Sequence, residues 1–168
     1  MVKIFQYQEH SALREKASSV KKEEIGSKKL AKIISDLKKA LTSQDDGVAI
    51  AAPQIGVSLR IFVVSGKAFA ISNGEDENAS DYKDMVFINP KIEKSSRKKE
   101  AMDEGCLSVR GKYGKVKRAE KTTMTALDES GKKFRYGGSG LISQIFQHET
   151  DHLDGILFTD KATDIENI

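Results

Sequence analysis

Hydrophobic residues recur at helical spacing between residues 27 and 43, where mostly Lys, Asp and Ser separate them. The apolar positions are Leu30, Ile33, Ile34, Leu37 and Leu41. A stripe with this period predicts an amphipathic helix that lies on the surface and buries one face. Ser27 precedes the stripe, and serine is a favoured N-cap residue, so we expect the helix to begin there.

A second helical pattern starts near Gly138 and runs to Leu153. Its apolar positions are Leu141, Ile142, Ile145, Phe146 and Leu153. Ser139 is the expected N-cap, and Asp154-Gly155 is the expected stop signal. This helix also carries polar residues on the side that its apolar residues turn towards the core.

The other apolar runs are short and rich in β-branched and aromatic residues, which is typical of strands. Strands are expected at residues 59–64, 85–90, 116–127 and 132–136. We expect Pro90 to end the second of them and Asp128–Gly131 to form a hairpin turn. Ser72–Asp84 is polar and acidic, which predicts a long mobile loop. The order of elements predicts one α+β domain, residues 1–168, with mainly antiparallel sheets around the C-terminal helix.

The composition narrows the class of protein. The chain has 168 residues, 38% of them hydrophobic, and a net charge of +3, which is too small to indicate DNA binding. The N-terminal residues lack the apolar core of a secretory signal, and no run of about 18 apolar residues predicts a membrane span. We therefore expect a cytoplasmic protein without a membrane partner, and a reduced compartment agrees with the single cysteine, Cys106.

The strongest chemical signal is the HExxH pattern formed by residues 148–152. At about 100° per residue, His148 and His152 lie one turn apart on one helix face, so both imidazoles can reach one metal. Glu149 lies close enough to contact a metal-bound water without ligating the metal, as a metallohydrolase requires. The alternative is a surface helix in which the short pattern arises by chance.

Two histidines leave a catalytic metal site one protein ligand short. Phe158 stands where metzincins have a third histidine, and Glu166, near the end of the chain, is a poor thermolysin-like ligand. Cys106 lies in the segment Glu104–Ser108. Most free cysteines are small buried hydrophobes, but beside an incomplete histidine pair we favour Cys106 as a thiolate ligand.

Residues 47–56 form a small, apolar segment without charges. Small residues let a substrate backbone approach closely. The side-chain amide of Gln54 can donate to a developing oxyanion. Alternatively, Gln54 only holds the backbone of a buried loop, and the segment taken alone favours this simpler role.

Three segments, taken in their order along the chain, resemble motifs of the peptide deformylase family. Gly47–Gln54, Glu104–Ser108 and Gln147–Gly155 correspond to that family's GxGxAAxQ, EGCLS and QHExDHLxG motifs. The ordered triple is far more specific than any one motif, and the likeness extends over most of the chain. The resemblance implies a partly open antiparallel β arrangement around the HExxH helix.

The resemblance implies an enzyme that removes the N-formyl group from the N-terminal formyl-methionine of newly made proteins and releases formate. It implies Cys106, His148 and His152 as the ligands of one divalent metal, natively Fe²⁺. The ligand set alone also suits Zn²⁺, Ni²⁺ or Co²⁺.

The same resemblance, combined with general metal chemistry, suggests a mechanism. Metal-bound hydroxide attacks the formyl carbon, with Glu149 as general base and then general acid. The side chain of Gln54 and the backbone N–H of Leu107 would hold the oxyanion.

Candidate substrate-binding residues are Gly47, Ala49, Ile50, Gly105, Met102, Leu141 and Ile145. The last three could form the apolar wall of a methionine pocket, and ordinary core packing explains each of them equally well. Backbone groups of Ala49, Ile50 and Gly105 could pair with an extended substrate as an added strand.

This chain departs from the family pattern at two places. Ala49 replaces the second glycine of the first motif, which would cause strain if that position needs a positive φ, or narrow the cleft if it needs only a slim residue. Val109-Arg110 stands where many members have an apolar residue and proline. Tyr113 falls near the place where several members have an arginine that contacts the substrate backbone, so Tyr113 and Arg110 are both candidates for that contact.

Other functions remain open at this point. Residues 91–121 are rich in Lys and Arg, which fits a weak ribosomal contact but is more simply a solvated face. A zincin-type protease would need another third ligand in place of Cys106. A non-enzymatic metal or redox sensor would not need Glu149, and Ala49 leaves room for a catalytically decayed member of the family.

Overall fold

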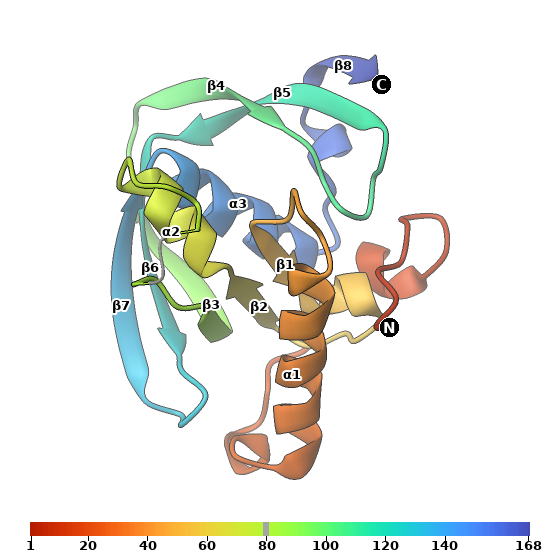
Figure 1. Ribbon diagram of the computed structural model, residues 1–168, viewed down its shortest axis with the longest axis vertical. Helices are drawn as coiled ribbons and strands as arrows, with labels where there is room; N and C mark the ends of the chain where they lie inside the picture. The colour runs from red at the N-terminus through yellow and green to blue at the C-terminus, as the bar shows by residue number, and fades with distance from the viewer. Residues whose placement is uncertain (79–80) are drawn as a thin grey trace.

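The computed structural model describes residues 1–78 and 81–168, and the statements below concern these residues (Figure 1). The helices are α1 (Lys28–Thr42), α2 (Gly66–Ser72) and α3 (Leu141–Leu153). The strands are β1 (Ala49–Ala51), β2 (Ile61–Val64), β3 (Met85–Ser95), β4 (Lys99–Glu104), β5 (Lys112–Ala119), β6 (Lys121–Leu127), β7 (Lys133–Ser139) and β8 (Thr163–Asn167).

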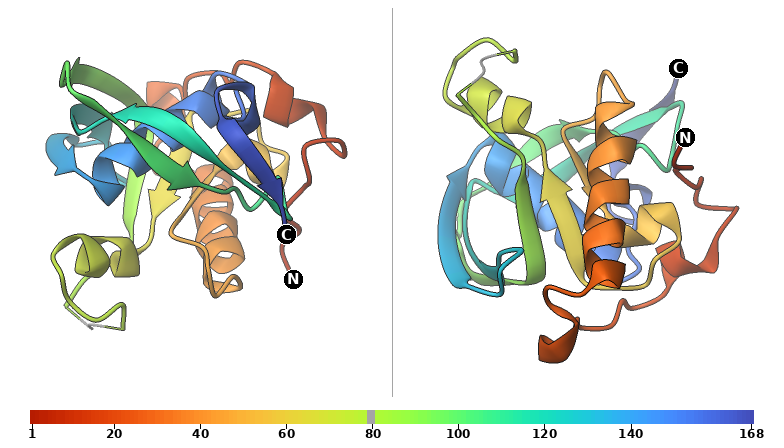
Figure 2. Two further views of the ribbon diagram at one scale, coloured as in Figure 1. Left: turned by 90° about the horizontal axis from the view of Figure 1, so that it is seen from above. Right: turned by 60° about the horizontal axis from the view of Figure 1, so that its bottom comes forward.

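Within the described residues, the strands form two antiparallel sheets. The first has the order β1-β2-β3-β6-β7 and the second has the order β4-β5-β8. The β4–β5 hairpin leaves the first sheet after β3, and the chain returns to that sheet at β6. Figures 1 and 2 show β4 and β5 arching over α3, which therefore lies between the sheets. The arrangement confirms the expected α+β class with open antiparallel sheets around the C-terminal helix.

Strand β2 shows how the core positions α3. Successive side chains of a strand point to opposite faces. Phe62 and Val64 belong to the core cluster that contains α3 residues, whereas Ile61 and Val63 belong to the cluster under α1. All four are fully buried, so α1 and α3 cover opposite faces of the first sheet. The outer side of α3 is thereby turned to the second sheet and to the segment that follows β4.

The first predicted helix is confirmed, and the start of the last helix needs a correction. The Ser27 side chain accepts a hydrogen bond from the N–H of Leu30 and caps α1 as expected. Ser139 is the last residue of β7 and does not cap α3. The N-cap is Gly140, whose φ of 55° permits the sharp turn from strand to helix. The expected stop is confirmed, with Asp154 as C-cap of α3.

Two strand predictions were wrong in detail. Pro90 does not end its strand, because β3 continues to Ser95. The register with β6 shifts between Ile88 and Lys91, so the missing N–H of Pro90 falls at a bulge, where it interrupts no regular ladder. Residues 116–127 are not one strand, because the chain passes from β5 to β6, and from one sheet to the other, at Glu120.

The acidic segment Ser72–Asp84 is described only in part. Helix α2 ends at Ser72, and turn and bend residues follow it. Residues 79–80 lie outside the described part of the chain, so the mobility predicted for this loop stays a prediction.

No helix among the described residues is long and apolar enough to cross a membrane.

Candidate active site

Three residues from two separate segments meet beneath the second sheet. His148 and His152 lie one turn apart on α3, with ring centroids 4.9 Å apart. Cys106 follows β4, and its Sγ lies 3.2 Å from Nε2 of His152. One ligand atom from each of the three residues lies within 4.8 Å of the others. The expected third partner of the histidine pair is therefore brought into place.

The donor set fits a transition metal. Nδ1 of His148 lies 2.6 Å from Oε1 of Glu104, which leaves its Nε2 for a metal. His152 directs Nε2 towards the Cys106 sulfur and is almost fully buried. One thiolate and two imidazoles suit zinc or iron, and the carboxylate behind His148 is the kind of outer partner that orients a ligating imidazole.

A buried ion-pair network lies behind His148. Arg118 donates to the Glu104 carboxylate through Nε at 3.0 Å and also through Nη2, and Nη1 donates to Asp151 at 2.7 Å. Lys161 completes the network on Asp151 at 2.9 Å. Burial raises the pKa of Glu104, but its contacts with His148 and Arg118 outweigh burial and hold the pKa at about 2. Glu104 therefore stays ionised at neutral pH.

The two histidines have different electrostatic surroundings. Burial lowers the pKa of His148, but its contacts with the Cys106 sulfur and the Glu104 carboxylate outweigh burial and raise it. Burial, reinforced by the nearby His148, lowers the pKa of His152. His152 therefore favours the neutral form that a metal ligand requires, whereas His148 would have to release its proton when a metal binds.

Glu149 lies beside the three candidate ligands and lines a cavity that opens next to them. It is 4% exposed, and its Oε2 has no hydrogen-bond partner among the described residues. Burial raises the pKa of Glu149 to about 7. A carboxylate with a pKa near neutrality can both accept and return a proton at physiological pH.

Gln54 holds the backbone of its buried loop, which is the simpler role considered from the sequence, and its side-chain amide also faces the site. Its Oε1 accepts a hydrogen bond from the N–H of Ala51 at 2.9 Å, which fixes the orientation of the amide. Its Nε2 then points to Ser108 Oγ at 3.2 Å and to Cys106 Sγ at 3.8 Å. The backbone N–H of Leu107 has no hydrogen-bond acceptor among the described residues, although the Leu107 carbonyl accepts from Gln6.

A cavity of about 240 Å³ opens beside the cluster. Of the predicted substrate-binding residues, the cavity is lined by Gly47, Ala49, Gly105, Leu141 and Ile145. Met102 and Ile50 are not among its lining residues. Met102 faces Val116 in the β4–β5 pair, and Ile50 packs into the core under α1.

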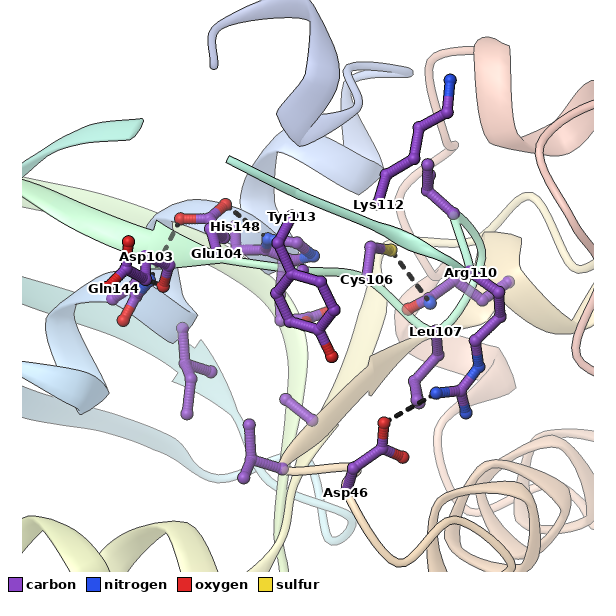
Figure 3. A pocket seen from close by; sticks show the side chains of 18 of the residues that line it. Asp46, Asp103, Glu104, Cys106, Leu107, Arg110, Lys112, Tyr113, Gln144 and His148 are labelled. Atoms are coloured by element: carbon purple, nitrogen blue, oxygen red, sulfur yellow. Dashed lines mark hydrogen bonds and ion pairs between the residues drawn. The ribbon is translucent and has the colours of Figure 1, made fainter. Parts of the chain in front are cut away.

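Some lining residues were not predicted from the sequence. These are Asp46, Val48, Asp103, Val109, Gly111, Lys112 and Gln144. Gln144 lies one turn before His148 on α3, and this helical spacing could have pointed to it. Figure 3 shows Asp103, Glu104 and Gln144 on one side of Tyr113, with Cys106, Leu107 and Arg110 on the other side.

The backbone of β1 offers a place for an extended substrate. The N–H of Ser65 donates to the carbonyl of Val48, so Val48 forms a hydrogen-bonded pair with β2. Such pairs alternate in antiparallel sheets, and Ala49 is the next residue along β1. The N–H and carbonyl of Ala49 therefore point away from β2, whereas those of Ile50 point to β2. The geometry favours Ala49 over Ile50 as a backbone partner.

The structure also decides what Ala49 does to the backbone. Among the described residues, the non-glycine positions with positive φ are Asn89 and Asp164. Ala49 is a regular strand residue, so the strain considered from the sequence does not arise. The remaining effect of the alanine is its methyl group, which narrows the cavity that Ala49 lines.

A family model described as "Polypeptide deformylase" matches residues 1–167 of this chain. The chain belongs to the peptide deformylase family. Peptide deformylase 2 of Clostridium acetobutylicum is 40% identical over 156 residues, which cover 93% of this chain and 92% of that protein. The resemblance inferred from the three motifs is thereby confirmed, and the chain is an enzyme of this metal-dependent family, which removes the N-formyl group from nascent proteins.

Solved deformylase structures share the fold. The Met-Ala-Ser-bound crystal structure of a class I type b peptide deformylase from Acinetobacter baumannii has a TM-score of 0.82 and 30% identity, covering 96% of this chain and 99% of that chain. The Synechococcus elongatus peptide deformylase in complex with actinonin has a TM-score of 0.80 and 31% identity, covering 97% and 79%.

Proposed function

We propose that this chain, acting as a single catalytic domain, hydrolyses the formyl-methionine N-terminus of newly made proteins and releases formate. Cys106, His148 and His152 hold one divalent metal, and Glu149 moves the proton. The observation that supports this proposal most directly is the convergence of these three donors within 4.8 Å, beside a buried carboxyl group whose pKa is raised to about 7.

The metal is expected to be Fe²⁺, and Zn²⁺, Ni²⁺ or Co²⁺ are alternatives for the same ligands. When bound, a metal of this kind would supply Lewis acidity and would lower the pKa of a water molecule to roughly 7. The protein contributes the position of the ligands. Glu104 orients the His148 ring, and Arg118 in turn holds Glu104.

Glu149 acts as general base and then as general acid. Its ionised carboxylate accepts a proton from the attacking water, and the protonated form passes that proton to the leaving amine. A pKa of about 7 suits both halves of this cycle. The Oε2 atom of Glu149 has no hydrogen-bond partner among the described residues, so this oxygen is available for the proton transfer.

Gln54 and Leu107 stabilise the negative charge that develops on the formyl oxygen. The amide of Gln54 is fixed through Ala51, and its NH₂ group faces the site. The N–H of Leu107 belongs to the peptide bond that follows Cys106, next to the same site. Loss of one preorganised donor of this kind typically lowers kcat by about 10²-fold or more.

Leu141 and Ile145 form the apolar wall for the methionine side chain. Both line the cavity, and both lie on the face of α3 that carries His148. Gly47 and Gly105 border the same cavity, where the absence of side chains leaves room for a peptide backbone. The backbone of Ala49 pairs with that peptide as with an added strand.

The basic segment 91–121 gives little support to a ribosomal contact. Arg118 is buried in the network behind His148. Lys115 pairs with Asp103, and Lys98 pairs with Glu100 and Glu120. Part of the positive charge is thus balanced locally, and formylated nascent peptides remain the proposed partner. A cytoplasmic location also stays a prediction, and one relative, from Arabidopsis thaliana, is named as chloroplastic/mitochondrial.

The first experiment measures anaerobic formate release from formyl-Met-Ala-Ser by iron-loaded protein. Glu149→Ala is compared with Glu129→Ala, which removes an exposed glutamate of the β6–β7 turn, and the metal content of every sample is assayed. We expect formate from the wild type and from Glu129→Ala, and none above background from metal-loaded Glu149→Ala. Metal binding by the wild type without any formate release would contradict the proposed function and favour a sensor or a decayed enzyme.

A further inference from the structure

The turn that carries the Leu107 N–H is held from outside by the N-terminal segment, residues 5–7. The N–H of Val109 donates to the Cys106 carbonyl at 3.0 Å, so Leu107 and Ser108 are the central residues of a tight turn. Such a turn closes with one backbone hydrogen bond of its own. The direction of the Leu107 N–H therefore depends on the contacts that hold the turn in place.

Gln6 supplies two of these contacts through one side chain. Its Nε2 donates to the Leu107 carbonyl at 3.1 Å, and its Oε1 accepts from the N–H of Arg110 at 3.1 Å. Both ends of the carboxamide are therefore used, and both partners are backbone groups in or next to the turn. A side chain that is bound at both ends fixes the position of the turn instead of only filling space beside it.

The rest of the N-terminal segment contacts both sides of the oxyanion site. The N–H of Tyr7 donates to the Ser108 carbonyl at 2.9 Å. The N–H of Phe5 donates to the Gln54 carbonyl at 2.8 Å. The Gln54 side chain in turn donates to Ser108 Oγ at 3.2 Å. The N-terminal segment thus connects the two parts of the chain that supply the proposed oxyanion donors.

The side chain of Arg110 gives the turn a second, more exposed support. Its Nη1 donates to Asp46 at 2.6 Å, and its Nη2 donates to the side-chain oxygen of Gln44 (Figure 3). The Arg110 and Asp46 side chains are 43% and 54% exposed, so water weakens this ion pair. Gln6, in contrast, contacts the backbone of the turn itself.

We propose that Gln6 is a positioning residue for the oxyanion site, where its carboxamide holds the turn that presents the Leu107 N–H to the formyl oxygen. The inference rests on the proposed function, because it concerns a donor to the charge that develops on that oxygen. Gln6 is not among the residues that line the cavity, so it acts through Leu107 and not on the substrate. An oxyanion donor acts mainly in the transition state, so loss of Gln6 lowers kcat and leaves substrate binding nearly unchanged.

The test compares two substitutions at Gln6. Gln6→Met removes both hydrogen bonds at similar volume, whereas Gln6→Glu keeps the acceptor for the Arg110 N–H and loses the donor to the Leu107 carbonyl. Gln8→Met and Gln8→Glu are the matched controls, because Gln8 is exposed and follows the same segment. KM and kcat for formyl-Met-Ala-Ser are measured anaerobically with iron-loaded protein, and kcat is expressed per bound metal.

We expect both Gln6 variants to lower kcat by roughly 5- to 20-fold, which is less than the loss of an oxyanion donor outright, with KM within about twofold of the wild type. The Gln8 variants keep the wild-type values of both. An unchanged kcat in Gln6→Met, or a KM that rises as much as kcat falls, would overturn the proposal. A wild-type kcat in Gln6→Glu would also overturn it, because the donor to the Leu107 carbonyl would then have no effect on the rate.

Hydrogen exchange provides a measurement that requires no turnover. In zinc-loaded protein the N–H of Val109 reports whether the turn is closed, because it donates to the Cys106 carbonyl. We expect it to exchange roughly 3- to 10-fold faster in both Gln6 variants, the effect of losing one hydrogen bond, and at the wild-type rate in the Gln8 controls. Absence of formate from the wild type would contradict the proposed function. The exchange rates would then decide the role of Gln6, and equal Val109 rates in the wild type and in the Gln6 variants would overturn it.

Discussion

Arg118 offers a sharp test of the network that positions His148. Replacing it by methionine keeps much of the side-chain volume and removes the positive charge. Arg118 is 2% exposed and Glu104 is 5% exposed, so the variant leaves the Glu104 carboxylate, and in part that of Asp151, buried without its partner. Breaking one side of a buried ion pair typically costs about 3–5 kcal/mol. The pKa of Glu104 is lowered from 4.5 to about 2 by His148 and Arg118 together, with His148 the larger cause. The full shift corresponds to roughly 3 kcal/mol by linkage, and the variant loses only the part that belongs to Arg118.

The assay is urea unfolding of metal-free protein at pH 7, with Lys115→Met as the control. Lys115 pairs with Asp103 at 2.8 Å, but the two side chains are 49% and 82% exposed, so its loss is expected to cost less than about 1 kcal/mol. Arg118→Lys keeps the charge without the bidentate contact to Glu104, and we expect its free energy of unfolding to lie between those of Arg118→Met and the wild type. Equal losses in Arg118→Met and Lys115→Met would refute the reasoning.

The pH dependence of the free energy of unfolding tests the same network in a second way. A carboxyl group with a lowered folded-state pKa contributes stability above its unfolded pKa, and this contribution is lost as the pH falls through the folded value. For Glu104 the window lies between about pH 4.5 and 2. The stability difference between the wild type and Arg118→Met should therefore shrink across that window. A constant difference from pH 7 to pH 2.5 would contradict the assignment to Glu104.

Four further outcomes are expected. Cys106→Ser should weaken metal binding by at least about tenfold, measured by competition with a chelator, because it replaces a soft thiolate ligand; unchanged affinity would argue for another third ligand. Ala49→Gly should lower the free energy of unfolding by roughly 0.5–1 kcal/mol because Ala49 is an unstrained strand residue, whereas a gain in stability would indicate strain. Gly155→Ala should lower Tm clearly, by calorimetry, since φ is 74° and the new Cβ would lie 2.8 Å from the backbone of Arg14. The contact with Arg14 lowers the pKa of Asp160 below its ordinary value of 3.8, so Asp160→Asn should cost up to about 1 kcal/mol at pH 7 and progressively less as the pH falls below 3.8; a cost that does not change with pH would exclude the ion pair.

The sequence was informative wherever chemistry depends on local spacing. The period of the apolar residues located α1 and α3, and Ser27 and Asp154 marked two of their ends. The HExxH spacing identified both histidines and Glu149, because positions four apart on a helix share one face. Strand details were less predictable, since Pro90 is accommodated by a register shift that only the pairing with β6 creates.

The amino-acid sequence by itself determined the family, the fold class and the set of chemically competent side chains, because these follow from residue type and short-range periodicity. Tertiary structure decided which of those side chains act together. Only the arch of β4 and β5 over α3 brings Cys106 within reach of His152 and places Arg118 behind Glu104. Likewise, only the folded chain shows that Arg110 is held by Asp46 and that Tyr113 lines the cavity, because such contacts join residues that are remote in sequence.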